Sequence, residues 1–242
     1  MWLADALQIV KNRNAVWRGH DLLATAEFIV DRVRPFVPAK ARHLDIACGS
    51  GQVLGAFHRI GCRGVGFDLS QRRLEYCRRN GIAVLSADMT ATLPFEDDSF
   101  DLVTLISTLE HVEHPDPFMK EVSRVLAPNG VVVAQIPNPR FPIDLHYFLP
   151  FYGYFPPSVR KVYRKLIVRN GYFISYYTNL ISKKDIARIF GGYKPLYIQD
   201  IAYPAEVAPN WLRPFYFMYR PVSRVFPTGH LFVYQKSNGV VQ

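Results

Sequence analysis

The feature that most constrains the fold is a short apolar segment followed by a turn with two glycines, at residues 43–54. The apolar part predicts a buried strand, interrupted only by Asp45. Gly49 and Gly51 lack a Cβ, so the backbone of the turn can take positive φ and let a ligand come very close. A helix that begins near Gln52 would point its free backbone N–H groups at that ligand. Such a strand, turn and helix are typical of sites for nucleotide-like ligands.

The positions of later residues separate two classes of ligand. A dinucleotide-binding turn requires a third glycine three residues after the second, but that position is Leu54. Asp68 and Asp88 follow the second and third predicted strands. An acid at the tip of the second strand can hold two ribose hydroxyls, and an acid after the third can accept a hydrogen bond from an adenine amino group. The pattern therefore argues against a nicotinamide adenine dinucleotide and favours another adenosine-containing cofactor.

Five motifs in order resemble those of the class I S-adenosylmethionine-dependent methyltransferases. They are L-D-I-A-C-G-S-G (44–51), G-F-D-L-S (66–70), A-D-M (87–89), L-P-F with S-F-D (93–101) and L-E-H-V (109–112). The resemblance covers residues 41–138, and it departs from the family at Ala47, where glycine is usual. It implies S-adenosylmethionine as cofactor, bound by Asp45, Ala47, Gly49, Gly51, Asp68, Leu69, Asp88, Met89 and Ser107.

The order of predicted elements indicates an α/β fold. Strands are predicted at 43–47, 63–67, 82–85, 101–107, 131–136, 193–201 and 230–236, and helices at 21–33, 51–60, 70–80, 114–130 and 182–190. We expect a Rossmann-like, seven-stranded, mostly parallel sheet with helices on both faces and the ligand beyond the carboxyl ends of the strands. The resemblance implies that the terminal strand is antiparallel.

We predict a single methyltransferase domain over residues 1–242 with two additions to the sheet. Residues 139–181, dense in Tyr, Phe, Pro, Arg and Lys, predict an inserted substrate cap after the fifth strand. Residues 204–228 predict an aromatic and basic insertion before the last strand, in which Arg213, Arg220 and Arg224 recur on one helical face. Two alternatives stay open for this insertion: contact with an anionic membrane surface, or packing on the protein's own cap.

Composition narrows the classes of partner and compartment. The net charge of +9 suits an anionic surface or substrate, but the basic residues are not concentrated in one run, so nucleic acid is not the expected partner. The three cysteines have no metal-ligand spacing and predict reduced thiols. Asp5 lies in a start without a long apolar run, so we expect no signal peptide. We therefore expect a cytoplasmic protein that either stays in solution or is peripheral at the membrane.

The resemblance implies methyl transfer, which needs alignment of the acceptor and removal of its proton. The candidates for a general base are His111, after the fourth strand, and His146, in the predicted cap. We expect no metal, because Glu110 and His111 alone make a thin ligand set and Ser107 stands where some related enzymes have another acid. The expected acceptor is a hydroxyl of a small or lipid-linked molecule: a quinone or phenol, a lipid or a glycan. A nicotinamide-dependent oxidoreductase and an inactive cofactor-binding or membrane-attached module remain the alternatives.

Overall fold

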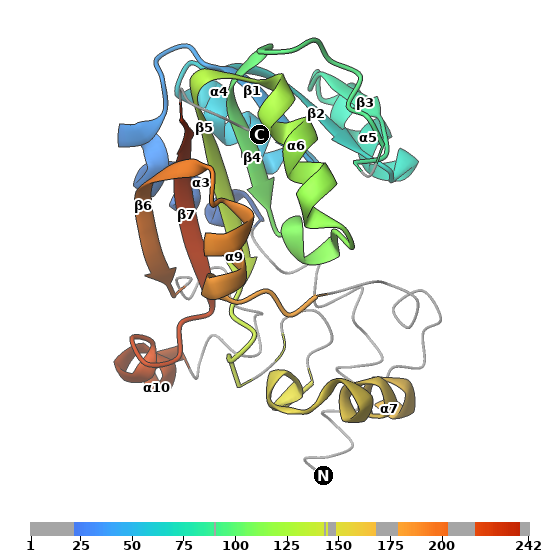
Figure 1. The fold of residues 1–242 in the computed structure, drawn as a ribbon, viewed down its shortest axis with the longest axis vertical. Helices are drawn as coiled ribbons and strands as arrows, with labels where there is room; N and C mark the ends of the chain where they lie inside the picture. Colours follow the sequence, from blue (N-terminus) through green and yellow to red (C-terminus); the bar gives the residue numbers. More distant parts are fainter. Residues whose placement is uncertain are drawn as a thin grey trace.

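A computed structural model describes residues 22–89, 91–142, 144, 149–167, 179–202 and 216–237. These residues form one seven-stranded sheet in the order β3-β2-β1-β4-β5-β7-β6 (Figure 1). The strands are β1 (Arg42–Ile46), β2 (Arg63–Asp68), β3 (Val84–Ser86), β4 (Phe100–Ile106), β5 (Leu126–Pro137), β6 (Tyr193–Ile201) and β7 (Gly229–Lys236). Only β7 is antiparallel to its neighbours, β5 and β6. The predicted fold class is confirmed.

Helices cover both faces of the sheet, which explains why its central strands are buried and mostly apolar. On one face lie α3 (Leu22–Val33) and α4 (Gln52–Arg59), and on the other lie α6 (Pro115–Val125) and α9 (Lys183–Ile189) (Figure 1). Neighbouring residues of one strand enter opposite cores, as Val132 packs with α6 and Val133 packs with α3. A further helix, α5 (Gln71–Arg79), packs against β2 and β3.

The start of α9 is fixed by a capping box. The Ser182 side chain accepts a hydrogen bond from the Asp185 backbone N–H, and the Asp185 carboxylate accepts one from the Ser182 backbone N–H at 2.9 Å. Two of the helix's free N–H groups are thereby satisfied. At α5, Ser70 occupies the N-cap position, but its hydroxyl makes no capping hydrogen bond.

The boundary between α6 and β5 also differs from the prediction. The helix was expected to continue to Asn129-Gly130, but it ends at Val125, and Leu126 is already extended with ψ of 125°. Pro128 accounts for this early end, since a residue that precedes proline is disfavoured in the helical region. Asn129 then takes φ of +61°, and the pairing of β4 with β5 shifts register between Leu102 and Phe100.

The parallel strands direct their carboxyl ends toward one end of the molecule, the lower end in Figure 1. Beyond this edge lie η3 (Tyr152–Tyr154), α7 (Pro157–Ile167), α10 (Tyr216–Tyr219) and η6 (Arg220–Val222). They belong to the two additions that the sequence predicts at 139–181 and 204–228. Among the described residues, no helix is both long enough and apolar enough to cross a bilayer.

Candidate functional site

The glycine-containing turn lies where the order of strands reverses. From β1 the chain adds β2 and β3 on one side, then crosses to place β4 on the other side of β1. Ligands of open α/β sheets bind in the crevice at this switch point, beyond the carboxyl ends of the strands. Ala47, Gly49 and Gly51 all have positive φ, of 58°, 57° and 77°. Ala47 therefore adopts a conformation that glycine takes more readily, at a cost of about 1 kcal/mol.

The two glycines of the turn have different surroundings. A Cβ placed on Gly49 would meet nothing closer than Arg73 Nη1 at 3.9 Å, so this side of the turn is open. A Cβ on Gly51 would lie 2.9 Å from Ile82 Cδ1 and 3.3 Å from Cys77 Sγ. Gly49 thus leaves room for a ligand, whereas Gly51 lets the turn pack against Cys77 of α5 and Ile82 after it.

Asp68, the last residue of β2, holds the turn in place. Its carboxylate is buried and accepts hydrogen bonds from the backbone N–H groups of Gly49 at 3.0 Å and Ser70 at 2.8 Å. Arg73 Nη1 lies 3.7 Å from the same carboxylate. A carboxylate offers about four lone-pair sites, so Asp68 can accept further hydrogen bonds from two ribose hydroxyls. The geometry is consistent with its predicted role.

Asp45 lies directly beneath the turn, in β1. Thr104, its register partner in β4, donates a 2.6 Å hydrogen bond to Asp45 Oδ1. Asp45 Oδ2 is buried without a hydrogen-bond partner among the described residues, although the nearby Leu54 amide favours the charged form. Burial raises the pKa of Asp45 to about 7. This buried oxygen beneath the turn suits an additional donor, such as the ammonium group of an amino-acid-containing cofactor.

A histidine that the sequence analysis did not single out completes this buried chain. His43 Nε2 lies 2.9 Å from Thr104 Oγ1. Because the Thr104 proton is directed to Asp45, the threonine oxygen must accept from His43, so His43 carries its proton on Nε2. Burial lowers the pKa of His43 to about 3, which keeps the ring neutral. The sequence contained one signal for this contact: His43, Asp45 and Thr104 are polar residues in two predicted strands that are otherwise mostly apolar.

The other residues predicted to bind the cofactor follow β2, β3 and β4. Leu69 is 64% exposed beside Asp68, and Asp88 is exposed two residues after β3. Met89 packs partly against the core. Ser107 has φ of +50°, and its hydroxyl donates to Gln135 Oε1 of β5 at 2.9 Å. All of these residues lie at the same edge of the sheet as the glycine turn.

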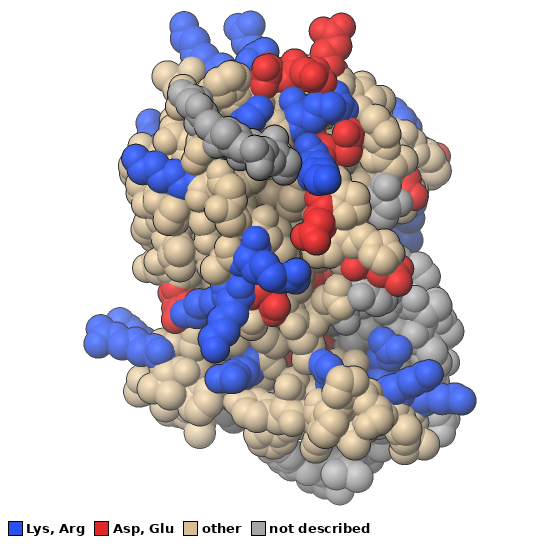
Figure 2. Space-filling view, in the orientation of Figure 1, with Lys and Arg blue, Asp and Glu red and all other residues tan. Residues whose placement is uncertain are grey.

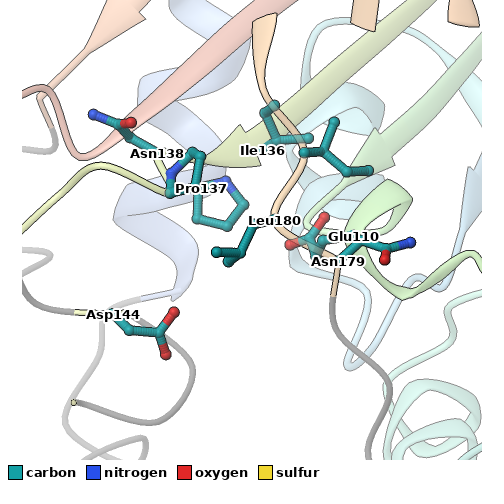
Figure 3. A pocket seen from close by; sticks show the side chains of 9 residues that line it. Glu110, Ile136, Pro137, Asn138, Asp144, Asn179 and Leu180 are labelled. Carbon is teal, nitrogen blue, oxygen red and sulfur yellow. The ribbon is translucent and has the colours of Figure 1, made fainter. Parts of the chain in front are cut away.

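A pocket opens at the carboxyl end of β5 (Figure 3). It is lined by Glu110, Ile136, Pro137, Asn138, Pro139, Asp144, Asn179, Leu180 and Ile181. The carboxylates of Glu110 and Asp144 lie on different sides of it, with Pro137 and Leu180 between them. The Glu110 side chain is 1% exposed. This combination of apolar walls and carboxylates can hold and orient a hydroxyl group.

The end of the predicted cap is attached to the loop that follows β4. Asn179 N donates to the Glu110 carbonyl at 2.7 Å, and Asn179 Nδ2 donates to the Val112 carbonyl at 3.0 Å. This loop contains η2 (Leu109–His111), so His111 is near the pocket in the chain but does not line it. His146, the other candidate base, lies outside the described residues. The sequence analysis named Glu110 only as a metal ligand and did not predict its place in this pocket.

The sequence predicts reduced thiols for the three cysteines. Cys48, Cys62 and Cys77 are buried and form no disulfide, and burial raises the pKa of the Cys48 thiol far above its ordinary value. In the part of the chain that the structure describes, no group of three His, Cys, Asp or Glu residues is arranged to hold a metal ion.

Comparison with known proteins concerns the central part of the chain. Residues 44–134, from β1 to β5, match a family model described as a methyltransferase domain. This segment carries the fold and the motifs of the class I S-adenosylmethionine-dependent methyltransferases. S-adenosylmethionine is the cofactor of this family, and the open side of Gly49, the Asp68 carboxylate and the unpartnered Asp45 Oδ2 fit it. The family match sets aside the nicotinamide-dependent oxidoreductase.

The curated relatives match part of this chain. It is 37% identical over 111 residues to a demethylmenaquinone methyltransferase of Clavibacter sepedonicus, which covers 43% of this chain and 45% of that protein. It is 28% identical over 155 residues to the demethylmenaquinone methyltransferase of Staphylococcus aureus (strain MRSA252), covering 61% and 64% of the two chains. The chain thus spans about half to two thirds of these relatives.

Solved structures show the same fold at lower identity. A methyltransferase from Thermotoga maritima superposes with a TM-score of 0.61 and 16% identity over 98% of this chain and all of that chain. A methyltransferase from Archaeoglobus fulgidus superposes with a TM-score of 0.60 and 14% identity over 88% and 94% of the two chains. These structures support the fold of this chain alone and carry no information on an acceptor.

Proposed function

We propose that this methyltransferase transfers a methyl group from S-adenosylmethionine to a hydroxyl group of a lipid-linked phenol or quinol. The observation that carries the proposal is the pocket of Glu110 and Asp144 at the same sheet edge as the cofactor turn. Relatives that are named demethylmenaquinone methyltransferases support an acceptor of the quinone class. We further propose that the chain acts in the cytoplasm on an acceptor drawn from a membrane surface.

The cofactor residues would act by binding and alignment. S-adenosylmethionine supplies a methyl group on a positively charged sulfur, which is already activated for in-line attack. Asp68 would accept the ribose hydroxyls, Asp88 would accept from the adenine amino group, and Asp45 would accept from the ammonium group. Leu69, Met89 and the Ala47–Gly51 turn would contact the cofactor through apolar and backbone atoms. Ser107 would mark the boundary between cofactor and acceptor.

A carboxylate in the pocket is the best-placed group to handle the acceptor's proton. Glu110 lines the pocket, so its carboxylate can accept a hydrogen bond from the acceptor hydroxyl and take the proton as the methyl group is transferred. His111 and His146 stay candidates for the same role. Glu110 adds a third candidate that is based on the geometry of the pocket.

Calorimetric titration with S-adenosylhomocysteine tests the cofactor, with NADH as the parallel control. We expect binding of the first and not of the second. Transfer of a labelled methyl group from S-adenosylmethionine to lipid-linked phenols and quinols then tests the reaction. Binding without transfer to any acceptor of these classes would refute the proposed acceptor, and binding of NADH alone would refute the proposed cofactor site.

Three variants compare the candidate bases. Glu110→Gln should lower kcat by about a hundredfold, since general bases typically contribute at least this factor. Glu113→Gln, an exposed acid in the same loop, is the matched control and should keep kcat. Affinity for S-adenosylhomocysteine should be unchanged in both. If His111→Gln loses kcat and Glu110→Gln keeps it, the base is His111.

A further inference from the structure

Most of the chain's excess positive charge lies in the two additions to the sheet. Residues 139–181 and 204–228 together contain nine Lys and Arg but only two Asp and Glu. They therefore carry seven of the nine net charges of the chain, although they are little more than a quarter of its length. The rest of the protein is close to neutral. A concentration of one sign of charge on part of a protein directs it to a surface of the opposite sign.

The described parts of both additions lie at one end of the molecule. α7 and α10 are both beyond the carboxyl edge of the sheet, at the lower end of Figure 1. Arg140 and Phe141 contact described parts of both additions. Tyr154 of η3 donates to the Arg140 carbonyl at 2.7 Å, and Phe141 packs edge-on against Tyr219 of α10 with 5.7 Å between the ring centroids. Figure 2 shows Lys and Arg side chains among broad areas of uncharged residues over this end.

The exposed surface of α7 includes a row of apolar side chains, where a helix in water usually has polar ones. Val159, Val162 and Leu166 follow the helical period on one face and are 45%, 57% and 73% exposed. Lys161 and Lys165 are exposed beside this apolar row. The adjoining side of the helix is directed to the protein, where Tyr163, one turn after Val159, packs against Phe155 and donates to the Pro150 carbonyl. The apolar row itself is exposed and is not part of the core.

The segment of α10 and η6 repeats this combination. Phe217, Met218 and Val225 are 71%, 62% and 72% exposed. Arg220 and Arg224 are exposed between and beside them. Exposed apolar side chains interleaved with basic residues, and without acids, suit the boundary between the headgroups and acyl chains of an anionic bilayer. Lys and Arg can bury their stems there and keep their charges among the headgroups.

We propose that these two segments form a membrane-binding surface for anionic lipid bilayers, consisting of Val159, Val162 and Leu166 of α7 with Phe217, Met218 and Val225. Lys161, Lys165, Arg220 and Arg224 supply its electrostatic attraction. Because the surface is at the carboxyl end of the sheet, the pocket of Glu110 faces the end that meets the bilayer. Its role in acceptor delivery rests on the proposed function, but its binding to lipid does not.

Flotation of the full chain with vesicles tests this surface. We expect the protein to float with phosphatidylcholine vesicles that contain phosphatidylglycerol at about 50 mM salt, and to float far less at about 500 mM salt, where charges are screened within a few ångströms. Absence of flotation with anionic vesicles at low salt would overturn the proposal. Binding to single-stranded RNA without binding to vesicles would overturn it as well.

Two pairs of matched variants test the residues. Lys161→Gln with Lys165→Gln should weaken partition by about 25-fold, since each basic residue near an anionic surface contributes about a fivefold factor. Arg78→Gln with Arg79→Gln removes two exposed charges from α5 and should keep partition. Leu166→Ser with Phe217→Ser should weaken it by about tenfold, whereas Ile198→Ser, which removes an exposed apolar residue of β6, should not. Equal losses in the test and control variants would refute the assignment.

The outcomes separate this surface from the proposed reaction. A chain that floats with anionic vesicles but methylates no lipid acceptor supports the membrane-binding surface and refutes the proposed function. A chain that methylates an acceptor in detergent but does not float with anionic vesicles supports the proposed function and refutes the membrane-binding surface. Thermal unfolding of each variant confirms that the substitutions, all at exposed positions, leave the fold intact.

Discussion

Thr104 Oγ1 donates a 2.6 Å hydrogen bond to Asp45 Oδ1, and both side chains are buried at the switch point of the sheet. The hydroxyl has one proton, so the direction of this bond determines the rest of the chain of contacts. His43 must donate to the threonine oxygen, and the Asp45 carboxylate is held beneath the turn that binds the cofactor. The position of the carboxylate therefore depends on a threonine in another strand.

Thr104→Val should destabilise the protein and weaken cofactor binding. The substitution leaves His43 Nε2 and Asp45 Oδ1 buried without a partner, which costs roughly 3 kcal/mol of unfolding free energy. Urea denaturation measures this loss, and calorimetry with S-adenosylhomocysteine measures the affinity. Thr104→Ser keeps the hydroxyl and should lose only about 1 kcal/mol through the missing methyl group. Similar losses in the two variants would show that the hydrogen bonds contribute little.

Asp45→Asn should change how stability depends on pH. Burial raises the pKa of Asp45 from 3.8 to about 7, so between these values the folded state holds a proton that the unfolded state has released. This group's contribution to stability is therefore present below pH 4 and is lost as the pH rises toward 7. The variant lacks this loss, so its stability relative to the wild type should rise by up to about 1.4 kcal/mol per pH unit in that window.

His43 changes the stability of the protein with pH in the opposite direction to Asp45, over an overlapping pH range. Its pKa is lowered to about 3, so the unfolded state binds a proton below pH 6.5 that the folded state excludes. Stability from this group is present above pH 6.5 and is lost as the pH falls toward 3. In Asp45→Asn the loss due to His43 is no longer offset, and the variant should be the more acid-sensitive protein. Urea denaturation from pH 4 to pH 7 distinguishes this outcome from parallel profiles, which would contradict the buried titration of Asp45.

Gly51→Ala should cost more stability than Gly81→Ala. Both glycines have positive φ, of 77° and 70°, so alanine is strained by about 1 to 2 kcal/mol at either position. A Cβ at Gly51 would also lie 2.9 Å from Ile82 Cδ1, whereas a Cβ at Gly81 meets nothing within 4 Å. The difference in unfolding free energy between the variants measures the clash alone. Equal losses would show that Ile82 moves away without cost.

Asp68→Asn should lower the affinity for S-adenosylhomocysteine by about a hundredfold, because hydrogen bonds to a charged carboxylate are stronger than those to an amide. It also removes one of the two acceptors that bind the backbone N–H groups of Gly49 and Ser70. Asp116→Asn, an exposed acid in the first turn of α6, is the control and should leave the affinity unchanged. Unchanged affinity in Asp68→Asn would remove Asp68 from the cofactor site.

Local sequence determined the fold class and the framework of the site. Apolar runs and turn residues predicted every strand of the sheet, and the spacing of Asp45, Gly49 and Asp68 placed them at one edge, because parallel strands bring their carboxyl ends together. The capping box at Ser182 was also predictable, since its partners are three residues apart. These features depend on neighbours in the chain or on the regular geometry of strands.

Tertiary structure decided the contacts between distant residues. The chain from His43 through Thr104 to Asp45 joins side chains about sixty positions apart and depends on the register of β1 with β4. The pocket of Glu110, Asp144 and Asn179 assembles three separate segments. The membrane-binding surface requires α7 and α10 to lie at the same end of the sheet. Sequence periodicity describes a single element, whereas the pairing of elements depends on packing and burial across the whole fold.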